Sequence, residues 1–245
     1  MPQFVSRTAS IYYEVHGQGP PVLLFAPGGM NSAVQMWANA TLNPLELFAD
    51  DFRLIAMDQR NTGQSSGPLD IEDPWGAYAR DQLELLDHLE VDRVHIIGCC
   101  IGGSFALKLI EQAPDRVHTA VLQQPIGIVG GNRSLYEQMW RTWGTRLAEH
   151  RSDIDLGAVE MFGTRMWARD FVVSVSRSFV GSCSTPLLVL PGTDRYHPTA
   201  AGREIAALAP AGQVLEPWND SPAHIVQAAV AIREFFKTHS HRRGP

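Results

Sequence analysis

The stretch VHIIGCCIGGSFALKL, residues 94–109, holds the residue types best suited to chemistry. A short apolar, β-branched run leads into a glycine-flanked pair of cysteines and then into the apolar spacing of a helix. The spacing G-x-nucleophile-x-G-G places Cys100 at the apex of a sharp strand-to-helix turn, which needs small neighbours. A helix that begins at the apex favours a thiolate over a thiol. The pattern therefore predicts a nucleophilic Cys100 at the carboxyl edge of a sheet.

The two other cysteines lack such a setting. Cys99 takes the variable position beside the apex, and Cys183 stands alone, so both are predicted to be small buried residues. Ser104, in the overlapping GGSFA, would already lie inside the helix and face away from the apex. Three cysteines without C-x-x-C spacing indicate neither a disulfide framework nor a zinc site. We therefore expect reduced thiols, no metal and no other cofactor.

A carbonyl attacked by this cysteine also needs donors for the negative charge that develops on its oxygen. The backbone amide of Ile101, directly after the nucleophile, is the expected first donor. A second should come from the loop APGGMNSAVQMW, residues 26–37, which follows an early apolar run. Its glycines let the backbone approach a substrate closely, so Gly28, Gly29 and Met30 are all candidates.

Seven segments have the apolar or β-branched composition and the Gly, Pro or Asp boundaries of strands. They are residues 11–15, 22–25, 53–57, 94–97, 120–123, 187–190 and 214–216. Helical spacing marks residues 75–89, 105–112 and 228–236. Strands that alternate with helices predict an α/β fold with a mostly parallel sheet, covered by helices on both faces. The first strands, which have no helix between them, would form an antiparallel edge.

Residues 125–178 interrupt this alternation with a glycine-rich entry and helical segments at 135–150, 158–168 and 171–180. Their position between two core strands predicts a small helical cap, inserted into a core of residues 1–124 and 179–245. Trp140, Trp143 and Trp167 are concentrated in this insertion. They either pack the cap onto the core or line an apolar substrate pocket, and the two roles are compatible.

Composition limits the classes of partner. The chain of 245 residues has 26 acidic and 20 basic side chains and no basic stripe, so we expect no nucleic acid partner. The start MPQFVSRTAS lacks the features of a signal peptide, and no apolar run approaches the roughly 20 residues that span a bilayer. We expect a soluble, cytoplasmic protein with a small-molecule substrate and no membrane partner. The oligomeric state is not predicted.

The chain resembles the α/β-hydrolase superfamily over nearly its whole length. The resemblance is carried by the turn GCCIGG at residues 98–103, here called the elbow, by the loop that contains PGGM at residues 27–30, and by the stretch FRLIAMDQRNTGQSSGP. Members often carry a D-x-R-x-x-G-x-S segment, which is matched here by Asp58, Arg60, Gly63 and Ser65. The elbow GCCIGG is similar to that of the dienelactone hydrolases, which place a cysteine in a Cys-His-Asp triad. The inserted cap resembles instead the capped esterases, enol-lactonases and carbon–carbon bond hydrolases.

This resemblance implies a catalytic acid after the strand at 187–190 and a catalytic histidine after the last strand. Asp194, in LPGTDRYHP, has the setting of the acid. His224 is the only histidine between the last strand and the final predicted helix, yet Pro222 looks like a first-turn proline and would place His224 inside that helix. His197, in the same loop as Asp194, is the alternative base, because an imidazole there can also reach the elbow.

These residues predict a hydrolase of a small ester, lactone or thioester. Cys100 would attack the carbonyl to form an acyl-thioester, and water activated by the histidine would then release the acid. Two alternatives stay open. An acyltransferase would use the same cysteine, because a thioester passes its acyl group readily to acceptors other than water. A hydrolase-like binding protein would keep the pocket without a working triad, since the base is not fixed by the sequence.

Overall fold

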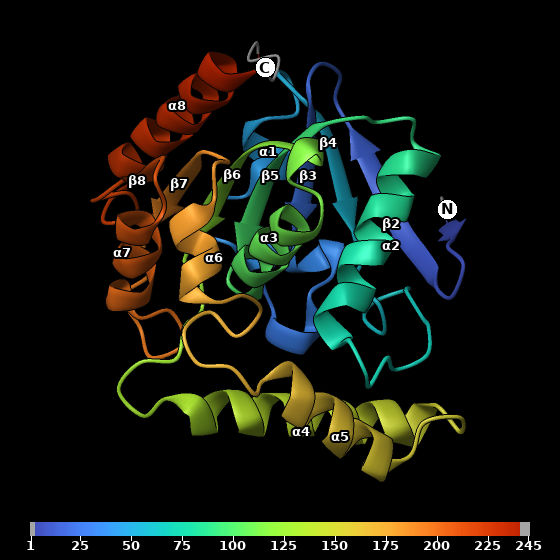
Figure 1. Cartoon of the computed structure of the whole chain (residues 1–245). Helices are drawn as coiled ribbons and strands as arrows, with labels where there is room; N and C mark the ends of the chain where they lie inside the picture. Colours follow the sequence, from blue (N-terminus) through green and yellow to red (C-terminus); the bar gives the residue numbers. More distant parts are fainter. Residues whose placement is uncertain (1–2, 241–245) are drawn as a thin grey trace.

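The computed structural model describes residues 3–240 of the chain, and they form one eight-stranded sheet with helices on both faces (Figure 1). The strand order is β1-β2-β4-β3-β5-β6-β7-β8. The strands are β1 (Gln3–Val5), β2 (Ser10–His16), β3 (Pro21–Phe25), β4 (Arg53–Met57), β5 (Val94–Cys99), β6 (Val117–Gln123), β7 (Leu187–Leu190) and β8 (Gly212–Val214). All neighbours from β4 to β8 pair in parallel, whereas β1 and β2 form an antiparallel edge. The predicted α/β fold with a mostly parallel sheet is confirmed.

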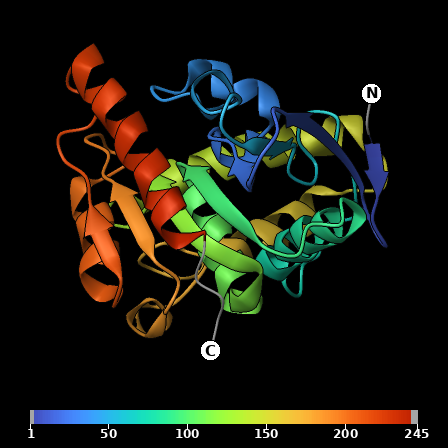
Figure 2. The same ribbon diagram turned by 90° about the horizontal axis from the view of Figure 1, so that it is seen from above.

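The helices are α1 (Pro44–Leu47), α2 (Pro74–His88), α3 (Ile101–Gln112), α4 (Arg133–His150), α5 (Leu156–Met166), α6 (Arg177–Ser182), α7 (Thr199–Leu208) and α8 (Pro222–His239). Three short 3₁₀ helices are η1 (Gly29–Asn31), η2 (Val34–Asn39) and η3 (Pro114–Arg116). Helices α2, α3 and α7 cover one face of the sheet, and α8 with the segment around α1 covers the other (Figure 2). Within residues 3–240, no helix is both long enough and apolar enough to cross a bilayer.

Two apolar cores follow from the period of the strands. Leu23 and Phe25 of β3 face the core beneath α2 and α3, whereas Val22 and Leu24 face the core beneath α8. Such alternation is expected for a strand covered on both faces, because successive side chains point to opposite sides. The last strand begins and ends two residues earlier than the predicted segment 214–216. It spans Gly212–Val214, and its pairing with β7 starts where Gly212 lies opposite Leu187.

Helices α4 and α5 form the inserted cap, a separate layer beyond one end of the sheet (Figure 1). The third helix predicted for the cap differs from the structure. Phe171 and Val173 have positive φ angles and are buried, so residues 171–176 form an irregular return to the core. The valines of this segment are β-branched, and such side chains disfavour a helix. The helix begins only with α6 at Arg177, and α6 contacts α7 of the core. The cap boundaries 125–178 stay a prediction.

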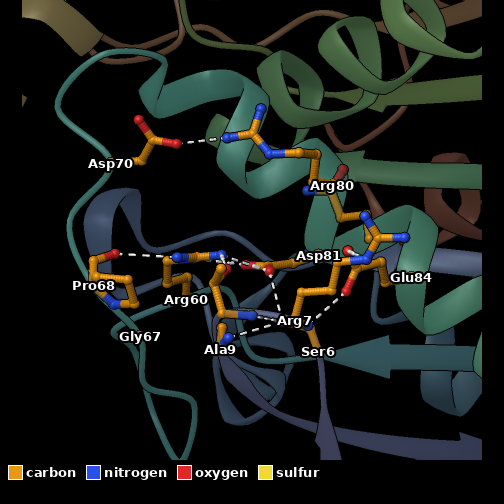
Figure 3. Close-up of polar contacts among 12 residues, drawn as sticks. Ser6, Arg7, Ala9, Arg60, Gly67, Pro68, Asp70, Arg80, Asp81 and Glu84 are labelled. Carbon is orange, nitrogen blue, oxygen red and sulfur yellow. Dashed lines mark hydrogen bonds and ion pairs between the residues drawn. The ribbon is translucent and has the colours of Figure 1, made fainter.

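A buried ion pair anchors the loop that follows β4 (Figure 3). Arg60 donates from Nε to Oδ2 of Asp81 at 2.8 Å and from Nη2 to Oδ1 at 2.7 Å. Nη1 of Arg60 also donates to the carbonyl of Pro68 at 3.2 Å. Both partners are at most 5% exposed, so each charge depends on the other for its stabilisation. The D-x-R-x-x-G-x-S segment therefore has a structural role in tying this loop to α2.

Candidate active site

A strained turn at Cys100 joins β5 to α3. Cys100 has φ 60° and ψ −119°, a backbone conformation that non-glycine residues rarely adopt and that costs about 1–3 kcal/mol. A Cβ atom on Gly98 would lie 2.2 Å from the carbonyl oxygen of Gly102, and one on Gly102 would lie 2.2 Å from that of Phe25. The glycines are therefore required by close backbone contacts. The turn presents the thiol at the carboxyl ends of the parallel strands.

The loop between β7 and α7 brings an acid and an imidazole to this edge. Oδ2 of Asp194 lies 2.8 Å from Nδ1 of His197, three residues further along the chain. Oδ1 of Asp194 accepts from the backbone amides of Tyr196 and His197 at 2.8 and 2.9 Å. Gly192 lets the loop close, because a Cβ there would lie 2.3 Å from the Cβ of His197. One short turn thus fixes the position of the carboxylate relative to the imidazole.

The free edge of the imidazole faces the thiol. Nε2 of His197 is buried, and the Cys100 thiol acts on the ring through a hydrogen-bond interaction and through its charge. Burial opposes a charged ring, but Cys100 and Asp194 outweigh it and raise the pKa of His197 to about 9. Burial also opposes ionisation of the thiol. The interactions of Cys100 with His197 and with the amides of Ile101 and Gly28 outweigh that effect, so its pKa lies below the ordinary value.

The carboxylate contributes to the same balance. Burial raises the pKa of Asp194, but its bonds to the ring and backbone of His197 outweigh this, and the net pKa lies below the ordinary value. Near neutral pH, the arrangement therefore favours a thiolate beside an imidazolium whose other nitrogen is held by a carboxylate. This is the charge state of an activated thiol nucleophile.

His224 lies elsewhere. Ser221 caps α8, accepting from the backbone amide of His224 at 3.2 Å, and Pro222 occupies the first helical position. The cap places His224 in the first turn of α8, and it is not among the residues that line the cavity around Cys100. Of the two histidines considered as base, the structure brings His197 to the elbow and leaves His224 away from it.

Backbone amides approach the sulfur from two sides. The amides of Ile101 and Gly28 both interact with Sγ of Cys100 and favour its charged form. Gly29 lines the cavity with φ 58°. The amide of Met30, the remaining candidate donor, points away and donates to Sδ of Met139 at 3.3 Å. Ile101 and Gly28 are therefore the two candidates with donors at the nucleophile.

The thiol opens into a cavity of about 360 Å³. Trp167 lines it and stacks on Tyr136, with ring centroids 5.2 Å apart. Other apolar or aromatic walls are Met36, Ile126, Met139 and Tyr196. No Asp, Glu, Lys or Arg lines the cavity among the described residues. The space therefore suits an uncharged ligand.

The other two tryptophans proposed for the pocket have different surroundings. Trp140 packs against Gly163 of α5, where a Cβ would lie 2.3 Å from its ring. Trp143 donates to the carbonyl of Asn61 at 3.3 Å and packs against Phe162, with the ring centroids 5.9 Å apart and the rings tilted. Both side chains are buried between the cap helices or against the core, so the assignment of Trp140 and Trp143 to the substrate cavity is corrected.

Cys183 and Ser104 lie outside the cavity around Cys100, whereas Cys99 forms part of its wall. Cys99 and Cys183 are buried, and burial raises the pKa of each thiol. Oγ of Ser104 donates to the carbonyl of Val172 at 2.8 Å, away from the elbow apex. Within residues 3–240, His, Cys, Asp and Glu side chains form no group of three or more that could hold a metal ion.

Sequence reasoning missed several walls of the cavity, above all Tyr136 and Met139. These residues lie three positions apart on α4 and therefore share one face of the helix. A helical wheel of the cap segment is the signal that identifies them. Gln124 also lines the cavity. It directly follows β6 and has a φ angle of 47°, and no local sequence pattern indicates this conformation.

The sequence model of a family described as alpha/beta hydrolase fold matches residues 21–210. A protein of Azorhizobium caulinodans named as a carbamate hydrolase, RutD, is 34% identical over 125 residues, which cover 50% of this chain and 43% of that protein. The 2-hydroxymuconate semialdehyde hydrolase of Pseudomonas sp. strain CF600 is 30% identical over 154 residues, 62% of this chain and 53% of that protein. The chain therefore spans about half the length of these relatives.

Solved structures show the same fold. The 2-hydroxy-6-oxo-6-phenylhexa-2,4-dienoate hydrolase of Rhodococcus sp. strain RHA1 has a TM-score of 0.70 at 18% identity and covers 95% of this chain and 97% of its own. An enol-lactonase of Burkholderia xenovorans LB400 has a TM-score of 0.67 at 18% identity, with 96% and 100% covered. At this identity the likeness concerns the arrangement of the backbone alone.

Proposed function

The chain belongs to the alpha/beta hydrolase fold family, and from that membership we propose that it cleaves a small ester, lactone or thioester with Cys100 as nucleophile. One observation carries the proposal: the strained elbow presents a thiol of lowered pKa to His197, whose ring is held on its other side by Asp194. Nucleophile, base and orienting acid are the three groups that acyl transfer through a covalent intermediate requires.

In the proposed first step, the Cys100 thiolate attacks the carbonyl carbon. The carbonyl oxygen becomes negatively charged and accepts hydrogen bonds from the amides of Ile101 and Gly28, which already point toward the sulfur. The tetrahedral intermediate collapses as the bond to the leaving oxygen or sulfur breaks. His197, protonated at Nε2, gives its proton to the leaving group, and the acyl group stays on the cysteine as a thioester.

In the proposed second step, His197 is neutral and accepts a proton from water at Nε2. The resulting hydroxide attacks the thioester, the same two amides hold the oxyanion, and the thiolate departs as the acid forms. Asp194 keeps its charge throughout: it accepts from Nδ1–H, fixes the tautomer and stabilises the imidazolium. His197, rather than His224, is the base in this proposal.

The walls of the cavity support a small and uncharged substrate. A volume of about 360 Å³ lies at the lower end of the usual range for small-molecule sites. The stacked rings of Tyr136 and Trp167 offer an apolar surface for a ring or a short chain. Two of the similar proteins are named as an enol-lactonase and a semialdehyde hydrolase, which is consistent with a small carbonyl compound. Three free cysteines support the further proposal of a cytoplasmic location.

The test compares wild type with Cys100→Ala on a panel of p-nitrophenyl esters, aryl thioesters and γ- and δ-lactones. We expect the variant to lose at least 10³-fold in kcat/KM, since removal of a nucleophile leaves only binding and the oxyanion donors. Cys183→Ala is the matched control, because that cysteine is buried away from the cavity. Unchanged turnover in Cys100→Ala would exclude this nucleophile.

Mass spectrometry of the wild type during turnover supplies the second measurement. Brief exposure to p-nitrophenyl acetate should leave an acetyl group on the peptide that contains Cys100. Turnover without any such adduct, combined with an active Cys100→Ala variant, contradicts a thioester mechanism. Faster release of the acyl group in the presence of an added amine or thiol, with the amide or thioester as product, would identify the acyltransferase alternative.

A further inference from the structure

One thioether of the cap contacts the loop that carries Gly28, one of the two proposed oxyanion donors. Sδ of Met139, on α4, accepts a hydrogen bond from the backbone amide of Met30 at 3.3 Å. Met139 also lines the cavity into which the nucleophile opens. Met30 is 3% exposed, and the thioether is the acceptor for its partly buried amide. The contact therefore joins helix α4 of the inserted cap to the loop whose Gly28 amide faces Cys100.

The conformation of the loop makes this contact possible. Gly28 and Gly29 have φ angles of 116° and 58°, so two consecutive residues lie in the left-handed region. A Cβ on Gly29 would lie 2.5 Å from Sδ of Met139, so only glycine lets the thioether lie over this position. These two glycines lie between the amide of Gly28 and the amide of Met30, and their backbone conformation lets the two amides point in different directions. The amide of Gly28 faces Cys100, and that of Met30 faces Met139.

We propose that Met139 is a positioning residue, which holds the loop in the one arrangement that aims the Gly28 amide at the reacting centre. This inference rests on the proposed function, because it assigns a purpose to that amide. By occupying the amide of Met30, the thioether prevents the loop from turning to present a different donor. The packing of the cap on the core and the placement of the Gly28 amide are thereby coupled, because the acceptor Met139 belongs to α4 and the Met30 amide belongs to the core.

The side chain needs both its shape and its sulfur for this role. Leucine has a similar volume and would keep the apolar wall of the cavity, but it has no acceptor and would leave the Met30 amide buried and unpaired. Glutamine has a similar length and carries an oxygen that accepts hydrogen bonds. Comparison of Met139→Leu with Met139→Gln therefore distinguishes the contribution of the apolar cavity wall from that of the hydrogen-bond acceptor.

The first measurement is steady-state turnover of the best ester or lactone found for the wild type. We expect Met139→Leu to lose about fivefold or more in kcat with KM within twofold, the size expected for one lost hydrogen bond that acts mainly in the transition state. Met139→Gln should recover most of that loss. Met161→Leu, an exposed methionine on the cap helix α5, is the matched control and should match wild type.

The second measurement does not require turnover. Because the Gly28 amide favours the ionised thiol, the pH profile of Cys100 alkylation by iodoacetamide reports where that amide lies. Its midpoint should move to higher pH in Met139→Leu and return in Met139→Gln. A wild type that cleaves no ester, thioester or lactone while this shift is present refutes the proposed function and leaves the role of Met139 standing.

Two outcomes overturn the inference. One is a Met139→Leu protein, folded by circular dichroism, with the kcat and the alkylation midpoint of wild type. The other is a Met139→Gln protein as impaired as Met139→Leu in both measurements, because the shape of methionine and not its acceptor would then be what matters.

Discussion

Replacement of His197 by alanine tests the central contact of the site. In the folded protein the pKa of His197 is raised from 6.5 to about 9. That rise of about 2.5 corresponds to roughly 3 kcal/mol in favour of the charged ring, since each unit of pKa is about 1.4 kcal/mol. Cys100 and Asp194 together supply this stabilisation against the cost of burial, and loss of the imidazole removes from the Cys100 thiolate the interaction that lowers its pKa.

Without the imidazole, burial is the largest influence left on the Cys100 thiol, and it raises the pKa. A thiol with a pKa of 9 or higher is ionised to about 1% or less at pH 7. We therefore expect alkylation of Cys100 by iodoacetamide at pH 7 to slow by about tenfold or more in His197→Ala. Turnover should fall further, by roughly 10²–10⁴, because the general acid and base are lost as well.

The assay is the rate of Cys100 alkylation between pH 5 and 10, followed by mass spectrometry. The pH at which the alkylation rate rises should differ between the two proteins. In wild type the thiolate persists below pH 9, because the pKa of Cys100 lies below its ordinary value. In His197→Ala the rate should stay low up to pH 9 and rise only above it. Ester turnover by wild type should decline above about pH 9, where His197 loses the proton that it gives to the leaving group.

His224→Ala is the matched control, because that residue lies in the first turn of α8 and does not line the cavity. It should retain the alkylation profile and at least half of the turnover. The reasoning is refuted if His197→Ala keeps the wild-type profile while His224→Ala loses activity, since the base would then be the histidine at the position that superfamily order favours.

Two further predictions concern stability, measured by urea unfolding with turnover as a check on the fold. Gly102→Ala should lose about 1–3 kcal/mol, because the new Cβ would lie 2.2 Å from a backbone carbonyl of β3, whereas Gly181→Ala has no neighbour within 4 Å of the new atom and should be neutral or slightly stabilising. Arg60→Ala should lose about 3–5 kcal/mol by leaving the carboxylate of Asp81 buried and unpaired, whereas Arg80→Ala, which breaks only exposed pairs, should lose at most about 1 kcal/mol (Figure 3). Equal losses within either pair of variants contradict the corresponding argument.

Much of the fold can be read from the sequence, because its signals are local. Apolar runs with glycine, proline or aspartate at their ends locate the strands from β2 to β7, and their alternation with helices predicts a mostly parallel sheet. The elbow is equally local: Gly98, Cys100 and Gly102 lie within five residues, and the close approach that requires the glycines occurs where β5 turns into α3. The return segment 171–176 is harder, because its buried residues have positive φ angles that depend on the surrounding core.

The partners of Cys100 depend on tertiary structure. The sequence places Asp194 and His197 three residues apart in one loop, but whether that loop or the start of α8 reaches the elbow depends on how β7 and β8 lie beside β6. The same holds for Met139, whose helix meets the core only after the cap has folded back. Spacing along a chain determines which residues share a turn or a face. Which of these faces meet is decided by the packing of distant segments, and that packing brings the imidazole to the thiol.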